Sequence, residues 1–199
     1  MRKKGGGHNK GSSFERAICK QLSLWWTGGK RDDIFWRTAG SGARATVRRR
    51  KNCATANSAG DVCALDAEGE PFIRQILIEL KKGYTKDIDV LKFIDALDGR
   101  KACLLWRWMD KAWGEAYDNK RREAWVIFQR DRSKAMLMIR AGFLVNLDRG
   151  DQLSYPYSKI EIDWVGKRIA IVVLADFLGW YKPPQIIATP KSGKTLKRL

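Results

Sequence analysis

Two charged side chains interrupt an apolar run in the segment 73–84, IRQILIELKKGY. Glu79 and Lys81 are flanked by Ile78 and Leu80, and side chains alternate between the two faces of a strand. Glu79 and Lys81 would therefore share one face with Leu77. Burying either charge alone costs several kcal/mol, so a second group has to compensate for it. The alternative is that the strand ends by Ile78 and that water solvates both charges.

A third charged residue, Asp61, opens the apolar segment 61–65. Segments 61–65 and 71–80 are predicted to be strands, and the short turn between them predicts that they pair as a hairpin. If Asp61 lies opposite residue 75 or 77, its side chain is on the face of Glu79, whereas a slip of one residue moves it to the other face.

Two converging carboxylates suit a hard divalent cation such as Mg²⁺, and a nearby lysine can orient a water molecule or offset charge on a phosphate. In a chain with a net charge of +17, such a site suggests phosphodiester hydrolysis.

The charge of the chain points to a polyanionic partner. Its 199 residues include 39 Lys and Arg against 22 Asp and Glu, which gives a net charge of +17. Nucleic acid is the first candidate and an anionic membrane surface the second. No apolar run approaches the length of a membrane-spanning helix, and residues 1–13 lack the apolar core of a signal peptide. We therefore expect a cytoplasmic protein that neither binds a membrane nor uses a small-molecule cofactor.

Several site classes do not fit the sequence. His8 is the single histidine and lies in a glycine-rich segment, which argues against a Ser-His-Asp triad or a histidine zinc site. The four cysteines form no C-x-x-C pair, so free thiols are expected. The segment SGKT at 192–195 ends like a phosphate-binding loop, but it lacks the first glycine and we expect no helix after it, so we do not expect such a loop.

The elements that would position these residues alternate between helix and strand. A capping box at Ser12–Glu15 predicts a helix start, and the basic segment 39–60 is predicted to be a long exposed loop. Further predicted elements are a strand at 33–38, a helix at 102–116, hairpins at 124–139 and 159–173, and a short helix at 174–180. We expect a single domain at 12–181 between flexible basic tails at 1–11 and 182–199. The pattern predicts an α/β or α+β fold with a central sheet.

Four segments together carry a resemblance to a known superfamily. GD at 60–61 and IELKKG at 78–83 resemble the D…(D/E)-x-K signature of PD-(D/E)XK nucleases. GSSFERAICKQL and WRTAGSGARAT are similar to segments of archaeal-type Holliday junction resolvases and their phage relatives. The resemblance covers roughly residues 11–82 and departs from the signature at Gly60, where the proline is missing. Residues 141–199 match no family pattern.

The resemblance implies a restriction-endonuclease-like core, in which helices flank a mixed β-sheet. The sequence patterns at 159–173 and 174–180 add an extra C-terminal hairpin and a short helix to this core. It implies a homodimeric endonuclease for four-way DNA junctions that uses Mg²⁺, with Mn²⁺ as a substitute. Glu15, Asp61 and Glu79 would hold the metal, Lys81 would serve the attacking water, Ser41 would approach the scissile phosphate, and Gln129 would be an auxiliary polar residue. We expect DNA contacts from Arg37, Arg44, Arg48, Arg49, Arg50, Lys51 and Lys82.

Several of these residues and segments have a second interpretation. Glu15 could merely satisfy a backbone N–H of a capping box. The tryptophans of segment 104–113 could stack on bases or pack in a core or dimer interface. A nuclease of this fold could act on flaps, single strands or duplex DNA instead of junctions. A non-catalytic nucleic-acid-binding protein would explain the charge, but it would leave the acidic residues on the strands unexplained.

Overall fold

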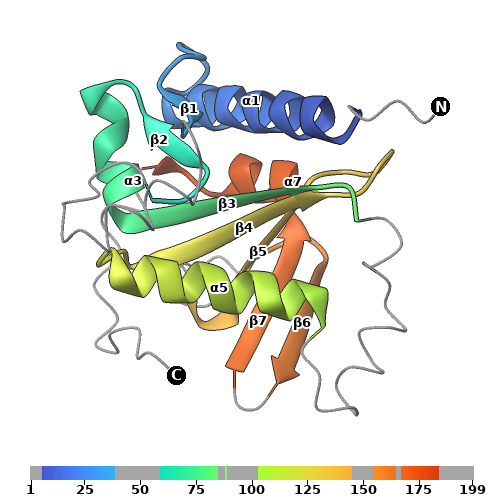
Figure 1. Ribbon diagram of the computed structural model, residues 1–199. Coiled ribbons are helices and arrows are strands. Elements are labelled where there is room, and N and C mark those ends of the chain that lie inside the picture. The colour runs from blue at the N-terminus through green and yellow to red at the C-terminus, as the bar shows by residue number, and fades with distance from the viewer. Residues whose placement is uncertain are drawn as a thin grey trace.

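The protein is a mixed α/β structure, and its computed structural model describes residues 6–38, 59–84, 88, 103–144, 155–164 and 167–183 (Figure 1). The elements in chain order are α1 (Gly6–Trp26), β1 (Phe35–Arg37), β2 (Val62–Ala64), the 3₁₀ helix η1 (Ala67–Gly69), α3 (Glu70–Gln75), β3 (Ile76–Lys82), α5 (Leu104–Asp118), β4 (Glu123–Gln129), β5 (Met136–Arg140), β6 (Lys159–Trp164), β7 (Lys167–Val173) and α7 (Leu174–Trp180).

The main sheet has five strands in the order β3-β4-β5-β7-β6. β3 and β4 run parallel, with Ile76 opposite Glu123, and the remaining neighbours are antiparallel. β1 and β2 form a separate antiparallel pair, in which Trp36 is opposite Cys63. The sheet, its flanking helices, the β6–β7 hairpin and the short α7 confirm the expected fold class.

The alternation of side chains along the strands divides the core into two layers. In β3, the side chains of Ile76, Ile78 and Leu80 belong to the apolar cluster that also contains residues of α1 and α7. Leu77 belongs to the other cluster, which is built around α5. Figure 1 shows α1 and α5 on opposite faces of β3. The face of β3 that carries Leu77 therefore looks toward α5.

The tryptophans of α5 pack inside the protein. Trp106, Trp108 and Trp113 are all buried, and they belong to the cluster that contains Leu77 and Met109. The rings of Trp106 and Trp113 meet edge to face, with centroids 5.7 Å apart, an arrangement favoured by aromatic pairs. Of the two alternatives for these side chains, the core position is the correct one.

The predicted hairpin between segments 61–65 and 71–80 is wrong. β2 pairs with β1, and residues 70–75 form the helix α3 instead of the first half of a strand. Pro71, at the start of the predicted strand 71–80, lies in the first turn of α3. Proline is well tolerated there because the first helical N–H groups have no partner within the helix.

The first helix begins earlier than the capping box predicted. α1 starts at Gly6, so Ser12 and Glu15 lie inside the helix and do not form its cap. The hydroxyl of Ser12 instead accepts a hydrogen bond of 2.6 Å from Arg37 of β1. The capping role considered for Glu15 is therefore excluded, although the division into a domain and two tails remains a prediction.

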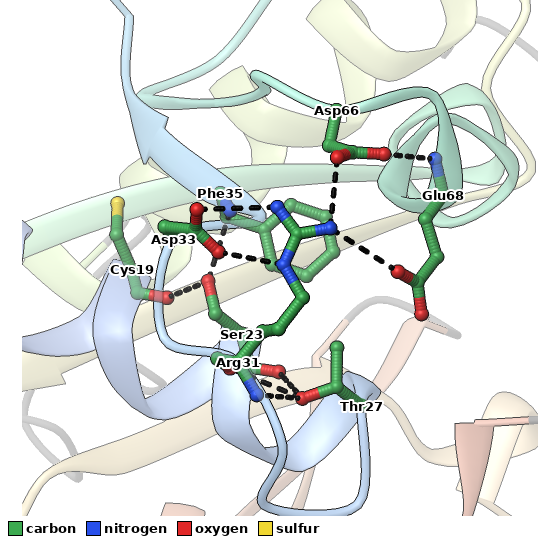
Figure 2. A network of polar contacts seen from close by, with 8 residues as sticks. All are labelled: Cys19, Ser23, Thr27, Arg31, Asp33, Phe35, Asp66 and Glu68. Atoms are coloured by element: carbon green, nitrogen blue, oxygen red, sulfur yellow. Dashed lines mark hydrogen bonds and ion pairs between the residues drawn. The ribbon is translucent and has the colours of Figure 1, made fainter.

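One arginine ties the end of α1 to the segment that follows β2, as Figure 2 shows. The guanidinium of Arg31 donates two hydrogen bonds to Asp33, at 2.9 and 3.1 Å, and one to Asp66 at 2.8 Å. Asp66 also caps η1 by accepting a hydrogen bond from the backbone N–H of Glu68. Ser23 completes the junction, because its hydroxyl accepts the N–H of Phe35 at the start of β1. These contacts fix the β1–β2 pair against α1.

Within the described parts of the chain, no helix combines the length and the apolar character needed to cross a membrane.

Candidate active site

Glu79 and Lys81 project from β3 toward α5, on the face that also carries Leu77. The side chain of Glu79 is only 6% exposed, so its charge needs compensation within the protein. Lys81 supplies it, with its ammonium nitrogen Nζ 2.5 Å from Glu79 Oε1. The charged pair is therefore part of the buried strand, and the alternative in which water solvates both groups is excluded for Glu79.

Asp61 lies beside the same part of β3, although no hairpin brings it there. Its backbone N–H donates to the carbonyl of Ile78 at 2.7 Å, and its Oδ2 accepts the N–H of Leu80, also at 2.7 Å. These two bonds flank Glu79 in the sequence of β3. Asp61 is itself buried, and its carbonyl accepts the N–H of Thr38 after β1. The two buried carboxylates thus sit on adjoining backbone segments that hydrogen-bond directly.

Gly60 allows this close approach of Asp61 to β3. Its φ is +76°, a left-handed conformation that glycine adopts readily. A Cβ atom at this position would lie 2.6 Å from the carbonyl oxygen of Ile78, which is far too close. A glycine directly before Asp61 is therefore required by the backbone geometry.

Two residues of α5, Lys111 and Glu115, complete the surroundings of Glu79 and Asp61, and neither was predicted from the sequence. Lys111 Nζ lies 3.1 Å from Glu79 Oε1, the same oxygen that Lys81 contacts. Glu115, one turn further along α5, accepts the N–H of Gly60 with its Oε1 at 3.0 Å. An i, i+4 pair of opposite charges beside the buried residues Ala112 and Ala116 was the available signal.

The electrostatics of this cluster keep Glu79 charged. Burial acts to raise the pKa of Glu79, but the ammonium groups of Lys81 and Lys111 outweigh it and hold the pKa below its usual value. Burial likewise acts to lower the pKa of Lys111, yet Glu79, followed by Glu115 and Asp61, raises it. The positive charge of Lys111 is therefore stabilised by three carboxylates, those of Glu79, Glu115 and Asp61.

Glu15 projects from α1, which packs on the other face of β3 from α5. Its carboxylate lies 3.5 Å from the guanidinium of Arg37. Burial raises the pKa of the Cys19 thiol to about 12, and the nearby negative charges of Glu15 and Asp61 contribute to this increase. Glu15 is thus close to the site, but in this structure it is paired with an arginine.

Lys82 and Gln129 form a neighbouring pair at the ends of β3 and β4. Lys82 Nζ donates to Gln129 Oε1 at 2.8 Å, and the amide of Gln129 donates to the backbone carbonyl of Ser133. Gln129 therefore holds the ammonium group of Lys82 at the end of β3. The other residues named from the sequence, namely Ser41, Arg44, Arg48, Arg49, Arg50 and Lys51, lie outside the described residues.

The chemistry of Asp61 and Glu79 fits a hard divalent cation, because both offer carboxylate oxygens. Two ammonium groups already converge on Glu79 Oε1, which shows that this oxygen attracts positive charge. Nevertheless, among the described residues no three His, Cys, Asp or Glu side chains lie together as a metal-binding group. The predicted trio of Glu15, Asp61 and Glu79 therefore does not form such a group here, and Glu15 is paired with Arg37 and Glu79 with Lys81.

Comparison with protein families gives a match over almost the whole chain. The model of the family described as "Phage putative PDDEXK endonuclease" matches residues 6–188. The chain belongs to this family. The match confirms the resemblance to PD-(D/E)XK nucleases and the link to phage. No curated protein and no solved structure matches the chain.

Membership of the family supports a nuclease of the PD-(D/E)XK type, for which DNA is the substrate. Nucleases of this type generally use divalent metal ions. Asp61, Glu79 and Lys81, which the sequence predicted to be motif residues, lie next to one another at β3. The segment 141–199, which matched no pattern in the sequence, lies largely within the family match and supplies β6, β7 and α7.

Proposed function

We propose that the protein is a divalent-metal-dependent endonuclease that hydrolyses phosphodiester bonds of DNA, with four-way junctions as its substrate. The observation that carries the proposal is the placement of Asp61 and Glu79. Both carboxylates are buried. Asp61 accepts a hydrogen bond from the backbone N–H of Leu80, the residue that follows Glu79, and Lys81 contacts the carboxylate of Glu79. Buried carboxylates beside lysines are expected where a cation and a phosphate have to bind together.

Each residue of the site has a proposed role. Asp61 and Glu79 would hold Mg²⁺, or Mn²⁺ in its place, and Glu15 would join them after leaving Arg37. A bound divalent cation lowers the pKa of a water molecule and offsets charge on the phosphate. Lys81 would orient the attacking water, and Glu115 would hold Gly60, and with it Asp61, against β3. Ser41 would approach the scissile phosphate.

The DNA would be held by cationic side chains around this site. Arg37 and Lys82 lie on the strands next to Glu15 and Gln129, and both are partly exposed. The basic run 48–51 precedes Asp61 in the sequence, so its connection to the site is short. The net charge of +17 on the whole chain also favours binding of a polyanionic substrate. A nuclease encoded by a phage would meet its DNA in the host cytoplasm.

The junction specificity rests on the resemblance of the segments around Glu15 and residues 36–46 to junction resolvases. Cutting a four-way junction symmetrically requires two active sites, which a two-fold homodimer supplies. We therefore include a homodimer in the proposal, with one active site for each of two opposing strands.

A panel of DNA substrates tests the proposal. A synthetic four-way junction, a flap, a single strand and a linear duplex of the same sequence are incubated with the protein in Mg²⁺ and in EDTA. We expect cleavage of the junction in Mg²⁺ at least about tenfold faster than of the duplex, and none in EDTA. Preferential cleavage of flaps, single strands or duplex would refute junction specificity but retain the nuclease. No cleavage of any DNA form would refute the nuclease and favour a non-catalytic binding protein.

A further inference from the structure

Two ammonium groups share a single carboxylate oxygen at the centre of the site. Lys81 and Lys111 both contact Glu79 Oε1, at 2.5 and 3.1 Å. One cation is sufficient to neutralise one buried carboxylate, so the second is not required for that purpose. The two lysines also differ in freedom, because the side chain of Lys81 is 19% exposed and that of Lys111 is 61% exposed.

The exposure and origin of Lys111 indicate which of the two can leave. Lys81 is two residues from Glu79 on the same strand, so its ammonium stays near the carboxylate. Lys111 reaches the site from α5 with most of its side chain in water, and moving its ammonium away from Glu79 costs little solvation. Lys111 is therefore suited to exchange one anionic partner for another.

We propose that Lys111 is a displaceable counter-ion of the candidate metal site, which a divalent cation releases from Glu79 and which then binds an oxygen of the substrate phosphate. This inference rests on the proposed nuclease function and adds a substrate-binding residue that lies outside the D…(D/E)-x-K motif. It also gives α5 a direct part in the chemistry of the site.

The charges of the cluster agree with such an exchange. Asp61, Glu79 and Glu115 carry three negative charges, and Lys81 and Lys111 carry two positive ones, which leaves one negative charge. One divalent cation converts this into one positive charge, which the single negative charge of a phosphodiester group balances. If Lys111 stayed on Glu79 Oε1, the metal and the ammonium would compete for the same oxygen and repel each other.

A metal titration without DNA tests the counter-ion role. Binding of Mn²⁺ to the full chain is measured by calorimetry for the wild type, Lys111→Met and the control Arg107→Met. Arg107 is an exposed residue one turn earlier on α5, and its substitution removes the same single charge. We expect Lys111→Met to bind Mn²⁺ about fivefold more tightly than the wild type, and Arg107→Met to change the affinity less than about twofold. Equal affinities for the wild type and Lys111→Met would overturn the proposal.

A cleavage measurement tests the phosphate-binding role. At saturating Mn²⁺ and protein, Lys111→Met should cut DNA about tenfold or more slowly although it binds the metal more tightly, and Lys111→Arg should recover part of the rate. A wild-type rate for Lys111→Met would overturn this role. Circular dichroism of each variant excludes misfolding as the cause. The titration contains no DNA, so it decides the counter-ion role even if the nuclease proposal fails, which would be seen separately as absence of cleavage by the wild type.

Discussion

Gly60 and Asp61 show how single residues shape the site. Asp61 reaches β3 only because the residue before it has a left-handed backbone and no side chain that would strike the carbonyl of Ile78. The proline that the superfamily signature carries at this position could not adopt that conformation, since its ring fixes φ near −65°. The departure from the signature is therefore part of how this chain holds its aspartate.

Replacing Gly60 by alanine should disrupt both stability and the site. A left-handed alanine costs about 1–2 kcal/mol, and the contact of its Cβ with Ile78 adds to this cost. Gly83→Ala is the matched control, because Gly83 also has a positive φ of +95° but nothing lies within 4 Å of its Cβ position. We expect Gly60→Ala to lower the free energy of unfolding in urea more than Gly83→Ala, and to reduce DNA cleavage at least about tenfold. Equal losses of stability would contradict this account of Gly60.

At the scale of elements, the sequence predicted the strands and helices better than their pairing. Short apolar runs were sufficient to find β4, β5 and β7, because strands buried on both faces are apolar throughout, and β6 was found from its alternating apolar residues. The pairing of β2 with β1 depends instead on contacts between distant segments, such as Arg31 with Asp66. Neither alternation nor turn residues encode such contacts.

The candidate site was likewise predicted in part. Asp61, Glu79 and Lys81 were identified because charged residues in or beside an apolar strand are conspicuous. Lys111 and Glu115 were not, because charged residues on a helix surface are common and usually face water. Their i, i+4 spacing is a weak signal, and the packing of α5 against β3 is what brings Lys111 to Glu79 and Glu115 to Gly60.

The network around Arg31 gives a prediction about acid stability. Hydrogen bonds from the Arg31 side chain lower the pKa of Asp33. The pKa of Asp66 is lowered first by the hydrogen bond from the Glu68 backbone N–H and second by the one from Arg31. When folding lowers the pKa of a carboxyl group, the group stabilises the folded protein at pH values above its ordinary pKa of 3.8. This contribution is lost as the pH falls through the lower pKa of the folded state. The Arg31→Met variant should therefore unfold more easily than the wild type at about pH 6.

The difference between Arg31→Met and the wild type should shrink as the pH falls below about 3. Urea denaturation at a series of pH values measures it. Lys20→Met is the control, because Lys20 pairs with the exposed Asp32 outside this network. A difference that stayed constant down to about pH 2 would show that the two aspartates do not act through Arg31.

The whole molecule carries a charge of +17, which should make DNA binding strongly dependent on salt. Each phosphate contact releases counter-ions, so the logarithm of the binding constant falls with the logarithm of salt concentration, by roughly 0.9 per contact. If the side chains of residues 48–51 contact DNA phosphates as proposed, replacing these four residues by alanine should make the slope less steep by about 2–4. Fluorescence anisotropy in EDTA measures binding without cleavage, and an unchanged slope would remove residues 48–51 from the interface.

The most direct test of the central claim compares binding and cutting in variants of the two buried carboxylates. Asp61→Asn and Glu79→Gln keep the size of each side chain but remove its charge, and so they weaken a metal site while leaving the basic surface in place. We predict that both variants bind a four-way junction with wild-type affinity in EDTA and cut it at least about a hundredfold more slowly in Mg²⁺. Full cleavage by either variant would contradict the assignment of Asp61 and Glu79 to the active site.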